Sequence, residues 1–326
     1  MILKAELHCH LEGAAPPDLV RTLAARYGAT LGPIFKTDGS YAWHDFTSFL
    51  AAYDAASRVF RTPEDYALLT ERYLAASAAE GCIYTEVFAS PDHARDAGLP
   101  YADYVAGIAE GMARAETAYG IVGRIIAICV RHYGPERAEA TARLVAAHPH
   151  PRVTGFGMAG EERTYRPADF ARAFAIARDA GLALTCHAGE LAGAEMVAAT
   201  LDAIPRVERI GHGVRAIEDA RVVRRLAETG IVLEVCPGSN LALGLFASWA
   251  EHPVEALRRA GVRVALGSDD PPFFHTTIGA EYEGVARAFG LDDAAMASVT
   301  RTALEAAFCD APTRAALLAR LDAASP

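Results

Sequence analysis

The chain has 326 residues, of which 52% are hydrophobic and 22% are charged, so it can bury a sizeable core and shows no sign of disorder. Its formal net charge of -10, with no cluster of Lys or Arg, excludes a nucleic-acid backbone as an expected partner. Charged residues interrupt its apolar runs well short of the roughly 20 residues that cross a bilayer, so no membrane is expected either.

The N-terminus and the cysteines both predict a cytoplasmic protein. The segment Met1–Glu6 has no apolar stretch with a cleavage site, which a secretory signal peptide would require. The six cysteines form no CxxC pair, and five of them lie in apolar, strand-like runs where a thiol behaves as a small hydrophobe. We therefore expect reduced, structural cysteines in a reducing compartment.

Short apolar runs recur along the chain with helical segments between them, which is the pattern of parallel strands joined by crossover helices. Most are rich in Val, Ile, Leu or Cys without strict alternation, as expected for strands covered on both faces. The eight runs are Ile2–His10, Cys82–Ser90, Val122–Val130, Arg152–Gly160, Ala183–Glu190, Arg209–Val214, Ile231–Asn240 and Arg263–Pro271. They predict an α/β fold, a closed (β/α)8 TIM barrel, in a single domain over residues 1–326.

The segment between the first and second runs is too long for one crossover helix. One helix is predicted to start at Pro16-Pro17, and a second runs from about Asp45 to Phe60. A third has Thr62 as its N-cap and ends at Gly81. The sequence thus predicts a helical insertion over roughly residues 14–80, which either decorates the barrel or forms a wall or lid over the substrate.

Five of the eight runs end or nearly end in His, Asp or Glu, and the C-terminal ends of barrel strands converge on one mouth. His8 and His10 are two residues apart on a strand, so both imidazoles point to the same face. The fifth run supplies His187 and the eighth supplies Asp269. Three neutral nitrogens and one carboxylate oxygen suit one Zn²⁺ per chain and leave a coordination position for water.

Three further residues at this mouth have the chemistry of catalytic groups. Zinc lowers the pKa of bound water from roughly 15.7 to about 7. His212 could orient or deprotonate that water; the alternative is that His212 is a hydrogen-bonded core histidine. If hydroxide attacks an aromatic amidine carbon of the substrate, negative charge develops on the adjacent ring nitrogen. Glu190 is placed to protonate that nitrogen, which requires a protonated carboxyl near pH 7. Asp270 either holds another ring nitrogen or belongs to an ordinary Asp-Asp-Pro turn.

Five motifs resemble those of the adenosine deaminase family in order and spacing. They are His8-Cys9-His10-Leu11-Glu12-Gly13, His187-Ala188-Gly189-Glu190, Gly211-His212-Gly213, Cys236-Pro237-Gly238-Ser239-Asn240 and Ser268-Asp269-Asp270-Pro271, within residues 4–271. The resemblance implies a TIM barrel with one zinc ion, bound by His8, His10, His187 and Asp269. It also implies that Glu190 protonates purine N1, that His212 handles the attacking water, and that Asp270 contacts N7.

The resemblance also assigns residues that bind the substrate. Met158-Ala159-Gly160-Glu161-Glu162 is similar to a family motif whose glycine amide meets purine N3, a role that passes to Gly160. His10 is counted as a substrate-binding residue as well as a ligand, and Asp269 as a catalytic residue as well as a ligand. The partner implied is a small purine nucleoside or base.

The expected reaction is hydrolytic deamination of adenosine, and with it 2'-deoxyadenosine, to inosine and ammonia by attack of zinc-bound hydroxide on purine C6. Gly211 and the segment 159–162 resemble the nucleoside branch of the family. Glu12, however, stands where the nucleoside enzymes usually have an Asp that binds a ribose hydroxyl, and Gly157 stands where the family commonly has Asp. Glu at the position of Glu12 also occurs in relatives that deaminate free adenine. Adenine, or another N6-amino or N6-substituted purine, is therefore the alternative substrate.

Two other classes of protein share part of this pattern. Two-metal barrel hydrolases of the dihydroorotase or phosphotriesterase type bridge their metals with a modified lysine on the fourth strand, but the lysines here are Lys4 and Lys36. A non-catalytic zinc- or purine-binding barrel is the second alternative, although binding zinc requires neither Glu190 nor His212. The remaining histidines are expected to be structural or exposed, except that His275 could line the mouth; they are His44, His93, His132, His148, His150, His252 and His275. The sequence does not indicate an oligomeric state.

Overall fold

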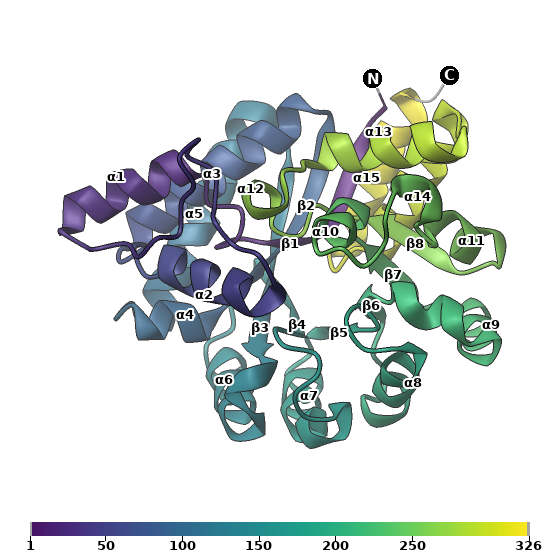
Figure 1. Cartoon of the computed structure of the whole chain (residues 1–326), viewed down its shortest axis with the longest axis horizontal. Helices are drawn as coiled ribbons and strands as arrows, with labels where there is room; N and C mark the ends of the chain where they lie inside the picture. The colour runs from purple at the N-terminus through teal and green to yellow at the C-terminus, as the bar shows by residue number, and fades with distance from the viewer. Residues whose placement is uncertain (1, 325–326) are drawn as a thin grey trace.

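A computed structural model describes residues 2–324 and contains one eight-stranded parallel sheet whose strand order follows the chain. Backbone hydrogen bonds from His10 N to Asp269 O and from Asp269 N to His8 O bring the last strand's end against the first strand. The strands are β1 (Lys4–His10), β2 (Cys82–Ala89), β3 (Val122–Val130), β4 (Val153–Ala159), β5 (Ala183–Ala188), β6 (Arg209–His212), β7 (Val232–Val235) and β8 (Arg263–Leu266). Helices surround the strands (Figure 1), which confirms the predicted (β/α)8 TIM barrel.

Each predicted apolar run contains a strand, but the seventh and eighth strands are shorter than their runs. β7 ends at Val235 and is followed by α10 (Pro237–Ala242), while α12 (Pro271–Phe274) begins soon after β8. Pro237 and Pro271 occupy the first turn of these helices, where the missing N–H costs nothing. Asp269 therefore lies in a loop just beyond β8.

The insertion after β1 consists of the three predicted helices, α1 (Pro17–Tyr27), α2 (Phe46–Ser57) and α3 (Pro63–Ala79). The Thr62 side chain accepts a hydrogen bond from the Asp65 backbone, and the Asp65 side chain accepts one from the Thr62 backbone. This reciprocal capping box confirms the predicted N-cap. In Figure 1 the insertion lies on the side of β1 to β4, and α2 lies in front of the ends of β3 and β4.

The remaining helices complete the outer layer of the barrel. They are α4 (Pro91–Asp96), α5 (Tyr101–Tyr119), α6 (Pro135–Ala147), α7 (Ala171–Asp179), α8 (Ala194–Ala203), α9 (Ala220–Thr229), α11 (Val254–Arg259), α13 (Ile278–Phe289), α14 (Asp293–Ala306) and α15 (Ala311–Ala324). Four short 3-10 helices, η1 (Arg131–Tyr133), η2 (Pro167–Phe170), η3 (Val214–Glu218) and η4 (Trp249–Glu251), lie in the connections. Leu304 of α14 and Leu317 and Leu321 of α15 pack in one buried cluster with Ala5 and Leu7 of β1.

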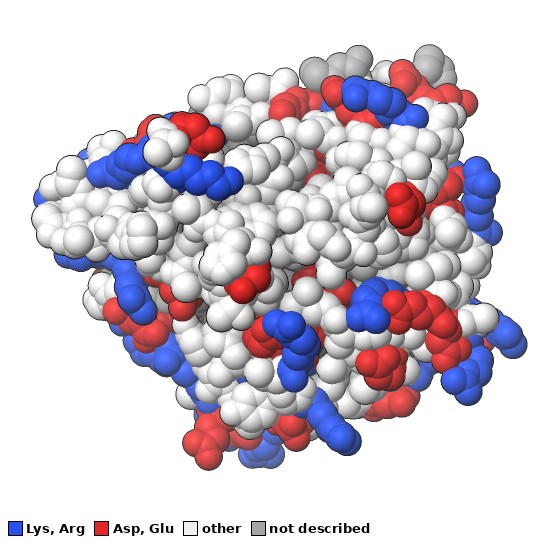
Figure 2. Space-filling model, in the orientation of Figure 1, with Lys and Arg blue, Asp and Glu red and all other residues white. Residues whose placement is uncertain are grey.

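Across residues 2–324, none of the helices is both long enough and apolar enough to span a membrane. On the face shown in Figure 2, basic and acidic side chains are interspersed around a mostly uncharged centre.

Candidate active site

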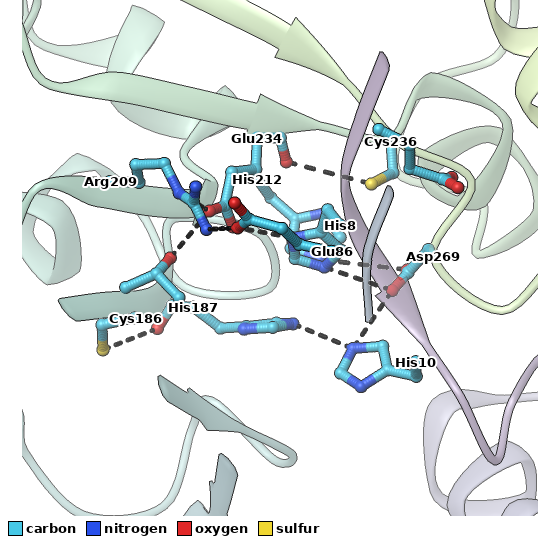
Figure 3. A network of polar contacts seen from close by, with 12 residues as sticks. His8, His10, Glu86, Cys186, His187, Arg209, His212, Glu234, Cys236 and Asp269 are labelled. Atoms are coloured by element: carbon cyan, nitrogen blue, oxygen red, sulfur yellow. Dashed lines mark hydrogen bonds and ion pairs between the residues drawn. The ribbon is translucent and has the colours of Figure 1, made fainter. Parts of the chain in front are cut away.

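The C-terminal ends of three strands bring the four predicted metal ligands together. His8 and His10 come from β1, His187 from β5 and Asp269 from the loop after β8. All four are buried, and one ligand atom from each lies within 4.8 Å of the others. His8 Nε2 and His10 Nε2 lie 3.3 and 3.4 Å from Asp269 Oδ1, and His10 Nε2 lies 3.2 Å from His187 Nε2 (Figure 3). These four residues could hold a metal ion.

The state of these side chains fits a divalent cation. His8 Nε2 is buried and has no hydrogen-bond partner, which in a protein interior marks a missing ligand. Burial lowers the pKa of His10, and burial together with the neighbouring imidazoles lowers the pKa of His187 further, so both rings are neutral as metal binding requires. Burial would also lower the pKa of His8, but Asp269 and Glu234 raise it to about 9, so a metal ion would displace a proton from this ring. Burial alone would raise the pKa of Asp269, but its contacts with His10 and His8 hold it well below its usual range.

Gly211 and two strained residues allow the ligands to approach so closely. A Cβ atom on Gly211 would lie 2.9 Å from both His187 Nδ1 and His8 Cε1, so a side chain here would displace the imidazoles. Asp269 and His212 have φ angles of 62° and 58°, a left-handed conformation that non-glycine residues rarely adopt. Such strain is characteristic of functional sites, where the surrounding structure enforces it.

Behind the ligands, a second layer of residues orients them, and the sequence did not reveal it. His8 Nδ1 donates to Glu234 Oε2 at 3.0 Å, which leaves His8 Nε2 to face the other ligands. Ser239 Oγ donates to Asp269 Oδ2 at 2.7 Å, and Arg131 Nη2 donates to the His187 carbonyl at 2.6 Å. Outer contacts of this kind commonly tune a metal site. Glu234 could have been noticed, because it is a charged residue inside the otherwise apolar strand β7.

Glu234 also belongs to a group of buried charges inside the barrel, which we call the interior ion cluster: Glu86, Arg209 and Glu234. Arg209 Nε donates to Glu234 Oε1 at 2.6 Å, and Arg209 Nη2 donates to Glu86 Oε2 at 2.5 Å (Figure 3). Burial would raise the pKa of Glu234, but Arg209 and His8 hold it below its usual range. The cluster therefore supplies His8 with an ionised acceptor.

Glu190 and His212 lie together at the mouth, as predicted. Glu190 Oε1 is 3.5 Å from His212 Nδ1 and accepts a hydrogen bond from Asn240 Nδ2 at 3.2 Å. Burial, and then the charges of Asp269 and Glu162, raise the pKa of Glu190 well above its usual value, so the protonated form is favoured. Burial lowers the pKa of His212 to about 3, so its ring is neutral.

The loop that carries Glu190 is held by Glu162, another residue whose role the sequence did not reveal. The buried Glu162 carboxylate accepts backbone hydrogen bonds from all four residues of the segment 189–192. Three of these, from Glu190, Leu191 and Ala192, measure 3.0, 2.7 and 2.9 Å. Glu162 follows the predicted substrate contact Gly160 by two residues, so the same short segment serves both the cavity and the neighbouring loop.

A cavity opens beside the metal ligands. Among the residues that line it are His10, His187, Glu190, His212, Gly160, Asp269 and Asp270. Phe46, Phe49, Leu50 and Tyr53 line it as well. All four belong to α2, so the helical insertion forms one wall of the cavity rather than a decoration.

Asp270 is confined by its neighbours. A Cβ atom on Gly13 would lie 1.6 Å from Asp270 Oδ1, so only glycine fits at position 13. Burial, together with the charge of Asp269, raises the pKa of Asp270 well above its usual value. Asp270 Oδ1 has no hydrogen-bond partner. The structure therefore favours a protonated Asp270 carboxyl, which can donate a hydrogen bond.

Glu12 is placed differently from the other predicted site residues. It is 1% exposed and is not among the residues that line the cavity. Tyr104 Oη donates to its Oε1 at 2.6 Å and Tyr53 Oη donates to its Oε2 at 3.3 Å. Both carboxylate oxygens of Glu12 are thus engaged by tyrosines of α5 and α2.

Comparison with known proteins agrees with this geometry. A family model described as adenosine deaminase matches residues 3–324. The chain belongs to the adenosine deaminase family. Members of this family are hydrolases that act on C–N bonds, and the deaminase described here is such an enzyme.

Relatives of this deaminase include proteins named adenine deaminase. It is 57% identical over 321 residues to an adenine deaminase of Chelativorans sp., a match that covers 98% of each chain. The crystal structure of adenine deaminase from Arthrobacter aurescens shares 31% identity with a TM-score of 0.91, covering 99% of this chain and 98% of that one. A zinc-bound amidohydrolase from Burkholderia ambifaria also shares 31% identity, with a TM-score of 0.90, covering 98% and 90%.

Proposed function

We propose that this deaminase hydrolyses free adenine to hypoxanthine and ammonia. The comparisons favour this alternative over adenosine, which the sequence motifs favoured, because the relative that is 57% identical over nearly its whole length is named adenine deaminase. The position of Glu12 supports the same choice, since tyrosines occupy both of its oxygens and it does not offer a carboxylate to a ribose hydroxyl. Of the described residues that line the cavity, none is Lys or Arg, the usual partners of a nucleotide phosphate.

The same proposal includes one zinc ion per chain, held by His8, His10, His187 and Asp269. The donor set of three imidazoles and one carboxylate supports it, as does the zinc in the amidohydrolase from Burkholderia ambifaria. When bound, zinc would act as a Lewis acid that makes a water molecule nucleophilic near neutral pH.

Each further residue of the site has a proposed task. The neutral His212 orients the attacking water and accepts its proton, while Glu190 donates a proton to N1 as the bond to C6 forms. Asp270 donates a hydrogen bond to N7, and the Gly160 amide and His10 help to hold the base. Asp269 contributes to catalysis by holding the water in place as well as by ligation. The pKa directions of Glu190, His212 and Asp270 support these protonation states.

We further propose that residues 1–326 form a single deaminase domain that acts in the cytoplasm on a small purine. The six cysteines are all free, which fits a reducing compartment.

A substrate comparison tests the proposed function. Zinc content and kcat/KM would be measured for adenine, adenosine, 2'-deoxyadenosine and N6-methyladenine, following the change in ultraviolet absorbance on deamination. We expect kcat/KM for adenine to exceed that for adenosine by at least about 100-fold. A higher value for adenosine would overturn the choice of substrate. No turnover of any purine by the zinc-loaded protein would favour the non-catalytic purine-binding barrel.

A further inference from the structure

A buried histidine outside the metal site is linked to the carboxyl of Glu190 through one amide. His252, which follows the 3-10 helix η4, is 2% exposed, Asn240 of α10 is fully buried and Glu190 is 6% exposed. His252 Nε2 lies 3.1 Å from Asn240 Oδ1, and Asn240 Nδ2 lies 3.2 Å from Glu190 Oε1. The three side chains therefore form one chain of hydrogen bonds that ends on the proposed acid.

The backbone determines the tautomer of His252. The Val254 N–H donates to His252 Nδ1 at 3.2 Å, so Nδ1 is an acceptor. Burial lowers the pKa of His252 to about 3, so the ring is neutral over the range in which the enzyme works. A neutral imidazole carries one hydrogen, which must then be on Nε2.

This tautomer in turn determines the orientation of the Asn240 amide. Because His252 Nε2 is a donor, the atom of Asn240 that faces it must be the oxygen, and the amide nitrogen must face Glu190 Oε1. The flipped amide would place two donors against each other in a buried site, which costs about 1 to 3 kcal/mol for each polar group left unpaired.

When a hydrogen-bond donor is fixed beside one oxygen of a protonated carboxyl, the carboxyl proton is carried by the other oxygen. We propose that His252 and Asn240 are positioning residues that keep Glu190 Oε1 as a hydrogen-bond acceptor, so that the proton to be delivered to the purine ring is carried by Oε2. The assignment rests on the proposed function, in which Glu190 is the acid. Glu162 holds the backbone of Glu190, and the His252–Asn240 pair selects the oxygen that reacts.

Substitutions at His252 separate positioning from simple packing. His252→Leu removes the donor, and we expect kcat for adenine to fall by about 10- to 100-fold while KM changes less than about threefold and zinc content is unchanged. His252→Gln restores an N–H donor and should recover kcat to within about fivefold of the wild type. The exposed His148 provides matched controls, because His148→Leu and His148→Gln should behave as the wild type.

A substitution of Asn240 gives a second test, and it does not create a cavity in the buried site. Asn240→Asp has nearly the same shape but presents a carboxylate oxygen to Glu190 Oε1, so kcat should fall at least as far as in His252→Leu. Wild-type kcat in His252→Leu or in Asn240→Asp would overturn the inference, as would His252→Gln being as slow as His252→Leu. Any of these three results leaves the proposed function intact if the wild type deaminates adenine.

Nitrogen NMR of the zinc-loaded wild type tests the tautomer without any turnover. One histidine should show the neutral Nε2–H pattern throughout the neutral pH range, and its signals should be absent from the spectrum of His252→Gln. An Nδ1–H tautomer or a charged ring at His252 would overturn the inference even if adenine is the substrate. Absence of adenine turnover by the wild type would instead contradict the proposed function.

Discussion

The interior ion cluster and the active site at the mouth of the barrel are adjacent, since His8 contacts both Glu234 and Asp269, yet they treat buried charge in opposite ways. Inside the barrel, Arg209 is shared between Glu86 and Glu234, and its remaining nitrogen donates to the Ala306 carbonyl at 2.9 Å.

At the mouth, the buried carboxylates lie beside imidazoles and are not paired with an arginine side chain as Glu86 and Glu234 are. His8 Nε2 and Asp270 Oδ1 make no hydrogen bond, and the pKa values of Glu190 and Asp270 are raised because burial and neighbouring negative charges disfavour ionisation. The interior ion cluster is complete within the chain, whereas the group at the mouth leaves polar atoms for the proposed metal ion and substrate. Substitutions in the two regions should therefore affect different measurements.

The largest expected effect lies at the mouth. Asp269→Ala removes one ligand and the acceptor shared with His8 and His10, so zinc and turnover should be lost together, with activity at least about 1,000-fold lower. Metal analysis and kcat on the same preparation measure this, with the exposed Asp179→Ala as a control. An active Asp269→Ala enzyme with a full zinc content would contradict the ligand set.

Glu190→Gln should separate the acid from the metal. The amide cannot deliver a proton to N1, so kcat should fall by about 100- to 10,000-fold while zinc remains bound. Glu195→Gln, at an exposed position in the first turn of α8 just after this loop, serves as the matched control. If Glu190→Gln kept full activity, the residue would not be the acid and the mouth would need another proton donor.

Arg209→Met should act on stability instead. It leaves the buried carboxylates of Glu86 and Glu234 without their shared cation, so the free energy of unfolding should fall by about 3 to 5 kcal/mol. Urea denaturation of the wild type, Arg209→Met and the exposed Arg224→Met gives the comparison. A loss below about 1 kcal/mol, close to that of the control, would show that the interior cluster does not stabilise the barrel.

Glu234→Gln sharpens the comparison, because Glu234 belongs to the cluster and also accepts from His8. The weaker acceptor should lower zinc affinity by about 10- to 100-fold, and excess zinc should restore most of the turnover. Competition with a chelator measures the affinity, with the exposed Glu228→Gln as a control. Unchanged zinc affinity would assign Glu234 to the interior cluster alone.

A pH dependence of stability is expected at Glu281, which accepts from Thr276 and from Gly238 N. Burial raises its pKa from 4.5 to about 8, so the folded state binds a proton that the unfolded state has released. Its contribution to stability is full below about pH 4.5 and is lost as pH rises through 8, by at most about 1.4 kcal/mol per pH unit. Urea denaturation over this range should show a shallower decline in Glu281→Gln, and equal slopes would contradict the shift.

Much of the barrel, and the convergence of the four candidate metal ligands, could be predicted from the sequence because their signals are local. Eight apolar runs marked the strands, the two-residue spacing of His8 and His10 placed both rings on one face, and Thr62 marked a helix start. Strand ends meet at one mouth in any closed parallel barrel, which brought His187 and Asp269 to the same point.

The tertiary structure decided the contacts between residues that are distant in sequence, because nothing in a local pattern specifies which side chains meet. Glu234 accepts a hydrogen bond from His8, which is 226 positions away in the sequence. His252, which was expected to be structural or exposed, contacts Asn240, the neighbour of the proposed acid Glu190. Glu12 matched a family position by sequence, but tyrosines from two helices bind its oxygens and keep it out of the cavity lining. The strand pattern was enough to predict the barrel and to place the candidate ligands at its mouth. Packing decides the orientation and the protonation of each group, because both depend on burial and neighbouring charge.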